Sequence, residues 1–101
     1  MPRMGLLVAA AMLAGLALAG CQLTRQSFQA VSVGQTPQEV QKILGAPKYQ
    51  FGDEWIYTSD DPRDLTKVAV YFGPDKTVVG KSWESPEKPW ENLREGRVPQ
   101  P

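Results

Sequence analysis

A single thiol and a short run of carboxylates are the most reactive side chains in this sequence. Cys21 is the only cysteine and histidine is absent, so the chain alone cannot assemble the usual zinc site, a Cys-His or Ser-His-Asp catalytic group, or an internal disulfide. Asp60, Asp61 and Asp64 could supply paired carboxylates for acid–base catalysis or a weak calcium site. No Glu is spaced to close a calcium loop, so we interpret these three residues as a solvated turn.

The equal numbers of basic and acidic side chains limit the classes of partner that we expect. The 101 residues carry 11 basic and 11 acidic side chains, so there is no basic excess to neutralise phosphates, and we expect no nucleic-acid partner. Serine hydroxyls have no histidine to activate them. We therefore predict a protein that is not an enzyme and that takes no small-molecule substrate, cofactor or metal.

The first twenty residues have the layout of a secretory signal peptide. One positive charge at Arg3 is followed by an uncharged run from Gly5 to Gly20. A helix of these sixteen residues spans about 24 Å, which is short of the roughly 30 Å hydrocarbon core of a bilayer. Residues 1–20 are therefore predicted to be a signal peptide rather than a permanent membrane helix.

This run ends in Leu18-Ala19-Gly20-Cys21, which resembles the lipobox of bacterial lipoproteins. That resemblance implies cleavage between Gly20 and Cys21 after the Cys21 thiol has been joined to a diacylglycerol. Because each buried CH₂ adds about 0.8 kcal/mol, two or three acyl chains would hold the protein firmly on a membrane. The alternative is an ordinary signal peptide followed by a chance cysteine. Gln22, where an Asp would signal inner-membrane retention, favours the periplasmic face of the bacterial outer membrane.

The rest of the chain divides into three parts. Residues 21–27 are predicted to be a lipidated N-terminus and a polar spacer. Residues 28–83 hold most of the aliphatic and aromatic side chains and are expected to form one small domain. Residues 84–101, rich in proline and charge, are predicted to be a tail with little core of its own.

One helix has clear start and stop signals. The segment 36–39 (Thr-Pro-Gln-Glu) places a hydroxyl at the N-cap, proline at the first helical position and glutamate at the third, which is the capping-box pattern. Apolar residues at i, i+3 and i+4 within 40–44 form a stripe, and Gly45 and Pro47 end the helix. A second helical turn is expected at 28–33.

The segments that follow alternate as strands do. Residues 55–58 and 65–72 are rich in aromatic and β-branched side chains and are separated by the polar turn 59–64. The turn 73–76, with Pro at its second position, leads into a third strand at 77–83. The predicted fold class is α+β, with one or two short helices packed on a three-stranded antiparallel sheet.

Strand alternation also assigns side chains to faces. In the second strand, Val68, Val70 and Phe72 share one face. In the third strand, Val79 is expected on the face of Trp83, together with Thr77 and Lys81, whereas Val78, Gly80 and Ser82 are expected on the other.

Several segments together resemble the SmpA/OmlA lipoprotein family of BamE-like outer-membrane protein assembly factors. The resemblance lies in residues 33–36 (Val-Gly-Gln-Thr), 44–47 (Leu-Gly-Ala-Pro), 55–57 (Trp-Ile-Tyr) and 70–72 (Val-Tyr-Phe), with Glu39-Val40 between the first two. It covers residues 31–83, about half the chain. It implies helices on a three-stranded antiparallel sheet, a fold also seen in BLIP-like modules, and a role beside the outer-membrane β-barrel assembly machinery. The N-terminal spacer lacks the longer segment through which the family contacts partners.

Aromatic side chains are the candidate binding residues, because Trp and Tyr are favoured contact types. Trp55, Tyr57 and Trp90 are the residues we select. Strand periodicity should bury about half of the group Tyr49, Phe51, Trp55 and Tyr57, but the sequence does not say which half. Trp90 lies in a polar, proline-rich segment, where it either contacts a partner or folds back onto the sheet edge as one helical turn with Leu93.

These features predict a lipid-anchored binding or scaffolding lipoprotein, an accessory factor in β-barrel assembly or envelope integrity. Its partners would be the membrane, through acylated Cys21, and proteins of the assembly machinery. A structural or stress-related envelope lipoprotein unrelated to barrel assembly is one alternative. A BLIP-like inhibitor or binding module is another.

Overall fold

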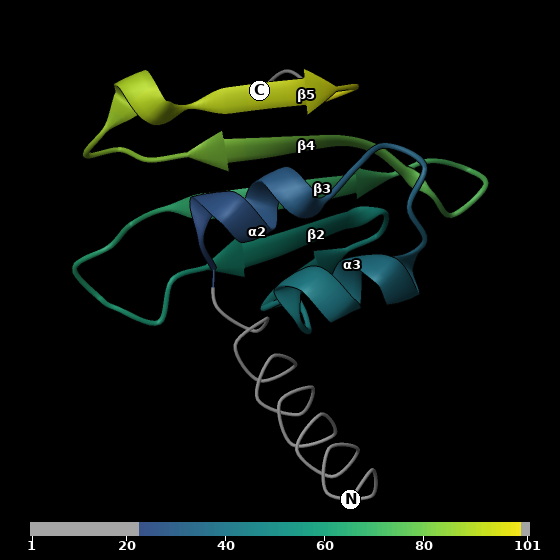
Figure 1. Cartoon of the computed structure of the whole chain (residues 1–101), viewed down its shortest axis with the longest axis horizontal. Coiled ribbons are helices and arrows are strands. Elements are labelled where there is room, and N and C mark those ends of the chain that lie inside the picture. Colours follow the sequence, from purple (N-terminus) through teal and green to yellow (C-terminus); the bar gives the residue numbers. More distant parts are fainter. Residues whose placement is uncertain (1–22, 100–101) are drawn as a thin grey trace, which may run out of the picture.

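The computed structural model describes residues 23–99 and shows an α+β fold in which two helices pack on a five-stranded antiparallel sheet (Figure 1). Gly20 and Cys21, with the predicted signal peptide and cleavage site, lie outside the described residues. The elements, in chain order, are α2 (Arg25–Ala30), α3 (Pro37–Leu44), β1 (Tyr49–Phe51), β2 (Glu54–Thr58), β3 (Lys67–Phe72), β4 (Val78–Glu84), the 3-10 helix η1 (Pro89–Glu91) and β5 (Leu93–Gly96).

The sheet is a meander, because its strands lie side by side in their sequence order. The three predicted strands correspond to β2, β3 and β4, and the prediction of three strands is corrected to five. Both additional strands lie at the edges, where β1 pairs with β2 and β5 pairs with β4. Each is only three or four residues long and fully or mostly exposed, so neither has the apolar alternation that identifies a half-buried strand.

The helix predicted from the capping box is confirmed as α3. The Thr36 hydroxyl accepts a hydrogen bond from the Glu39 backbone N–H, and the Glu39 carboxylate accepts one from the Thr36 backbone N–H. Gly45 ends the helix with φ of 82°, a backbone region that favours glycine. Val40 and Leu44 are buried, so the predicted stripe faces the sheet.

Helix α2 begins inside the segment that was predicted to be a spacer, and it ends before the predicted turn 28–33 does. Thr24 caps it, with its hydroxyl accepting from the Ser27 backbone N–H. The helix is polar apart from Phe28, which is fully buried. A six-residue helix with one apolar residue has no detectable periodicity, so only its docking through Phe28 reveals it.

Both helices cover the same face of the sheet, and the core lies between the helices and the sheet. The side chains of Trp55, Val70 and Phe72 point to this face, and the Trp55 and Phe72 rings meet edge to face at 4.7 Å. The Phe28 ring of α2 meets Trp83 of β4 in the same way at 5.5 Å. The buried cluster is Phe28, Val31, Val40, Leu44, Trp55, Tyr57, Val68, Val70, Phe72, Val78 and Trp83.

A lysine is buried inside this apolar layer. The Lys81 ammonium donates to the backbone carbonyls of Phe28 at 2.7 Å and Val31 at 2.6 Å, and it pairs with the Glu95 carboxylate at 3.3 Å. The same ammonium lies 4.4 Å from the centre of the Phe28 ring. Lys81 therefore joins the carboxyl end of α2, where a cation is favourable, to β4 and β5.

One face assignment is wrong because of a β-bulge. The register of β3 and β4 shifts between Tyr71 and Phe72, so that Phe72 pairs with Val78 and Tyr71 with Gly80. Val78 is 1% exposed and belongs to the core, whereas Val79 was expected there. The residue inserted by a bulge reverses the alternation on one side of it, and sequence periodicity does not reveal it.

The predicted tail 84–101 carries more structure than expected. Its residues 89–91 form η1 and residues 93–96 form β5. After Gly96 the chain turns onto the face that the helices leave open, and the Arg97 backbone N–H donates to the Val79 carbonyl at 2.8 Å. This close approach requires Gly80, because a Cβ there would overlap backbone atoms of Arg97.

Candidate functional site

Two of the three selected aromatic residues are buried and form part of the core. Trp55 is 9% exposed and Tyr57 is 5% exposed, and both side chains point toward the helices. The Tyr57 hydroxyl donates to the Gly45 carbonyl at 2.9 Å, which ties β2 to the end of α3. Burial raises the pKa of Tyr57. Their expected role as exposed contact residues is corrected, because both side chains belong to the buried cluster.

The exposed half of the aromatic group is on the neighbouring edge strand. Tyr49 is 49% exposed and Phe51 is 64% exposed, and their rings stack with centres 6.1 Å apart and planes 21° apart. Both belong to β1, which pairs only with β2 in the five-stranded sheet. The two-residue spacing of these aromatic residues could be seen in the sequence and predicts that Tyr49 and Phe51 lie on the same face. The sequence did not show that no helix covers the face on which they lie.

A groove of about 700 Å³ continues from Phe51 across the open face. Its lining includes Tyr71 of β3 and, after β5, Val98 and Pro99. Asp53 and Glu54 add carboxylates at the β1–β2 turn. We call the combination of the β1 rings and this groove the open-face site; its residues are Tyr49, Phe51, Asp53, Glu54, Tyr71, Val98 and Pro99.

Tyr71 lies in the middle of this site and is partly buried. Burial is the main cause that raises the pKa of Tyr71, and the nearby carboxylates of Glu54 and Glu84 raise it further, while its hydrogen bond with Ser82 opposes the shift. The hydroxyl is therefore neutral at physiological pH and can donate or accept a hydrogen bond. The open-face site thus offers aromatic rings, an apolar wall and a few polar groups, the combination found in peptide-binding surfaces.

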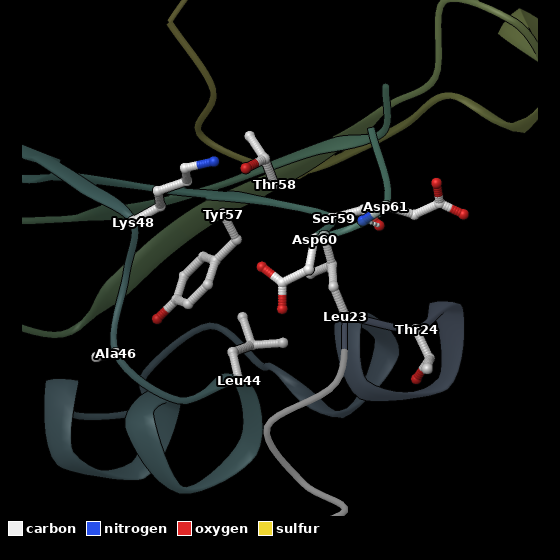
Figure 2. A pocket seen from close by; sticks show the side chains of 10 residues that line it. All are labelled: Leu23, Thr24, Leu44, Ala46, Lys48, Tyr57, Thr58, Ser59, Asp60 and Asp61. Carbon is white, nitrogen blue, oxygen red and sulfur yellow. Dashed lines mark hydrogen bonds between the residues drawn. The ribbon is translucent and has the colours of Figure 1, made fainter. Parts of the chain in front are cut away.

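A second cavity, of about 540 Å³, lies between the helices and the β2–β3 loop (Figure 2). Figure 2 shows the Tyr57 ring and Leu44 on two sides of it, with the Asp60 carboxylate directed toward them and Thr58 pointing away. Leu23, the first described residue, also lines this cavity. Ser59, Asp60 and Asp61 contribute polar side chains to its lining.

The acidic loop residues form turns, as the interpretation from sequence proposed. One carboxylate oxygen of Asp61 accepts from the Arg63 backbone N–H at 2.9 Å. One of Asp64 accepts from the backbone and hydroxyl of Thr66 at 3.0 and 2.6 Å, and these bonds lower the pKa of Asp64. Within residues 23–99 no group of three or more Asp, Glu, His or Cys side chains is arranged to hold a metal ion.

Trp90 is the selected aromatic residue that does lie on the surface. It is 77% exposed and belongs to the 3-10 helix η1, which ends at Glu91 and does not include Leu93. The alternative of one helical turn that packs Trp90 and Leu93 together is therefore corrected: Leu93 is the first residue of β5 and packs against the core, and the Trp90 side chain is in solvent.

Two further observations complete the description. No helix within residues 23–99 combines the length and hydropathy needed to cross a bilayer. No protein-family model, curated protein or solved structure matches this chain.

Proposed function

We propose that this chain is a lipid-anchored lipoprotein of the bacterial outer membrane, of the SmpA/OmlA type, that binds other envelope proteins as an accessory factor in β-barrel protein assembly. The anchor would be Cys21, acylated after cleavage behind Gly20. The domain would act on the periplasmic face by holding partners and not by transforming a substrate.

The open-face site is the main structural observation that supports this proposal. An edge strand presents unpaired backbone groups, and an extended segment of another protein can add to it as a further strand. In β1 this edge carries two exposed stacked rings, Tyr49 and Phe51, beside an apolar groove. Backbone pairing would supply affinity for an extended segment, and the rings and groove would select its side chains.

An anchor makes such a site effective at modest affinity. Confining the domain to the membrane surface raises its concentration relative to other proteins of that membrane, so weak contacts suffice. The open-face site suits this arrangement. Phe51 pairs with Glu54 at the start of β2, whereas the chain enters the domain at Leu23, near the loop that follows Thr58 at the other end of β2. The site therefore lies away from the proposed anchor.

Site-specific crosslinking tests the proposal. A photoreactive residue at position 51, introduced into the full chain in cells, should crosslink to a subunit of the β-barrel assembly machinery. The matched control is the same residue at position 42, which is exposed on α3 and remote from the open face. Capture of no assembly subunit at position 51, or equal capture at both positions, would count against the proposal.

A deletion strain separates this function from its main alternative. Loss of an assembly factor should lower the levels of outer-membrane β-barrel proteins. Detergent sensitivity with normal barrel levels would instead indicate a structural envelope lipoprotein.

The anchor has a direct chemical test. Cys21→Ala should abolish labelling with radioactive palmitate and leave the precursor uncut, because the thiol is the acylated group. Labelling that persists in this variant would refute the assignment of Cys21.

A further inference from the structure

Trp90 is the most exposed large apolar side chain among the described residues, and neither the core nor the open-face site uses it. Its backbone is nevertheless held firmly. η1 follows β4 after a turn, and the Asn92 side-chain carbonyl accepts from the Ser85 backbone N–H at 2.8 Å. The exposed indole is therefore a candidate for a contact outside the domain. Such a contact is favourable because a Trp side chain buries a large apolar area when it binds.

The backbone beside Trp90 is bonded to the first turn of α2. The Arg25 guanidinium, in the first turn of α2, donates to the Glu91 carbonyl at 2.8 Å. The same guanidinium lies over the Trp83 ring at 5.1 Å, which fixes its position. The residue next to Trp90 is therefore bound to the residue that starts α2, although 66 positions separate them in the sequence.

The loop between β2 and β3 reaches the same end of the sheet (Figure 1). Lys67 at the start of β3 pairs with Glu84 at the end of β4, directly before the turn that leads to η1. Leu65, in this loop, is 57% exposed. We call this end of the domain the anchor end; it consists of the start of α2, the β2–β3 loop and η1.

The stretch of chain between Cys21 and the domain is short, so an acylated Cys21 would hold the anchor end at the membrane surface. Leu23 is two positions after Cys21, which is a reach of at most about 7 Å. The headgroup layer of one leaflet is also roughly 5–7 Å thick. If Cys21 is acylated, the start of α2 must then lie at headgroup level, and η1, which carries Trp90, is bonded to that start through Arg25 and Glu91.

We propose that the anchor end rests on the outer-membrane leaflet that holds the acylated Cys21, with the Trp90 indole inserted at the boundary between headgroups and acyl chains. This inference rests on the proposed lipid anchor. Trp is favoured at that depth because its ring is apolar while its N–H remains hydrogen-bonded to headgroups or water. Insertion would orient the domain so that the open-face site points away from the bilayer.

The charges of the anchor end indicate how it binds. In the β2–β3 loop, in η1 and in the turn that leads to η1, the exposed basic residues Arg63 and Lys88 are accompanied by the exposed acidic residues Asp60, Asp61, Asp64, Glu87 and Glu91. Anionic lipids add little electrostatic binding energy for a surface that carries both signs of charge, whereas they attract a polybasic patch. Insertion of Trp90 should therefore occur in zwitterionic vesicles and should not weaken as salt is raised.

Fluorescence quenching by lipid tests the proposal, because the other two tryptophans, Trp55 and Trp83, are buried and serve as internal references. The acylated full-length mature protein is reconstituted in phosphatidylcholine vesicles whose acyl chains carry bromine, a short-range quencher. Its emission is compared with that of Trp90→Phe, so the difference reports Trp90. We expect this difference to be quenched and shifted to shorter wavelength, and the emission of Trp90→Phe to be unaffected.

The matched control places a tryptophan of similar exposure at the other end of the sheet. Val33 is 61% exposed and is followed by Gly34, which bonds to Val78 at the start of β4. In the Trp90→Phe background, Val33→Trp should remain unquenched. Quenching at both positions, or at neither, would overturn the proposed orientation. If the protein floats with the vesicles while Trp90 is unquenched, only this inference fails; if it does not float, the proposed anchor fails with it.

Discussion

The two faces of the sheet are built from the same five strands but differ in what covers them. The helix-covered face is closed by α2 and α3 over Trp55, Val70 and Trp83. The open face is crossed only by the residues after Gly96, and it leaves Tyr49 and Phe51 in solvent. The main hydrophobic core therefore lies on one face, and the proposed binding site lies on the other. Substitutions on the two faces should therefore have separable effects.

The largest expected effect is on the covered face. Trp83→Ala should lower the free energy of unfolding by about 3–5 kcal/mol, the usual cost of deleting a buried aromatic ring, because Trp83 packs on Phe28 and is 8% exposed. Phe51→Ala on the open face should change it by less than about 0.5 kcal/mol. Urea unfolding of both variants measures the difference. Similar losses for the two would show that the faces are not separable.

The buried cation should have the next largest effect. Lys81→Met keeps the length of the side chain but leaves the Phe28 and Val31 carbonyls without their donor, which should cost roughly 2 kcal/mol in unfolding free energy. Glu95→Gln should cost no more than about 1 kcal/mol, because the Glu95 side chain is half exposed. Equal stability of Lys81→Met and the parent would mean that the ammonium adds nothing beyond its packing.

A change of similar size should act on the open face itself. The Cβ introduced by Gly80→Ala collides with the Arg97 backbone, so we expect a loss of about 1–3 kcal/mol and release of the segment after Gly96. Amide hydrogen exchange at Arg97, whose N–H is bonded to Val79, reports this release. Gly52→Ala is the control: its Cβ meets nothing within 4 Å, and only its φ of 59° causes strain. Unchanged Arg97 exchange in Gly80→Ala would contradict the assigned contact.

The smallest effect is expected where the covered face meets α3. Tyr57→Phe removes the hydrogen bond to Gly45 and should cost about 1 kcal/mol at neutral pH. Burial holds the folded-state pKa of Tyr57 above its ordinary value of 10.0, so the unfolded chain ionises first and stability falls as pH rises above about 10. Tyr57→Phe should reduce this alkaline loss. Parallel curves of stability against pH for the two proteins would show that Tyr57 does not cause it.

The elements that could be predicted are those whose signals are local. The capping box at Thr36 and the stop at Gly45 specify α3 within a few residues, since each acts through hydrogen bonds to its own neighbours. Alternating apolar residues identify β3, whose inward side chains Val68, Val70 and Phe72 are all buried. The α+β class follows from these local patterns together.

The candidate site was predicted less well. A spacing of two among aromatic residues indicates alternation but not which residues have a neighbour above them, so Trp55 and Tyr57 were selected although Tyr49 and Phe51 are the exposed pair. For Trp90 the polar surroundings in the sequence left two alternatives open, an exposed contact residue or a turn folded back onto the sheet, and the structure shows the side chain exposed. Nothing local predicted that Lys81 would be buried, since its acceptors come from residues 50 and more positions away.

The sequence by itself therefore determined the capped helix and the central strands, because these depend on residue type and near neighbours. The tertiary structure decided the remainder: edge strands β1 and β5, the bulge that moves Val78 inward, and the contact of Arg25 with the segment that carries Trp90. Each of these arises from backbone pairing or from contacts between distant residues, whose free energy depends on the folded neighbour and leaves no periodic trace in the chain.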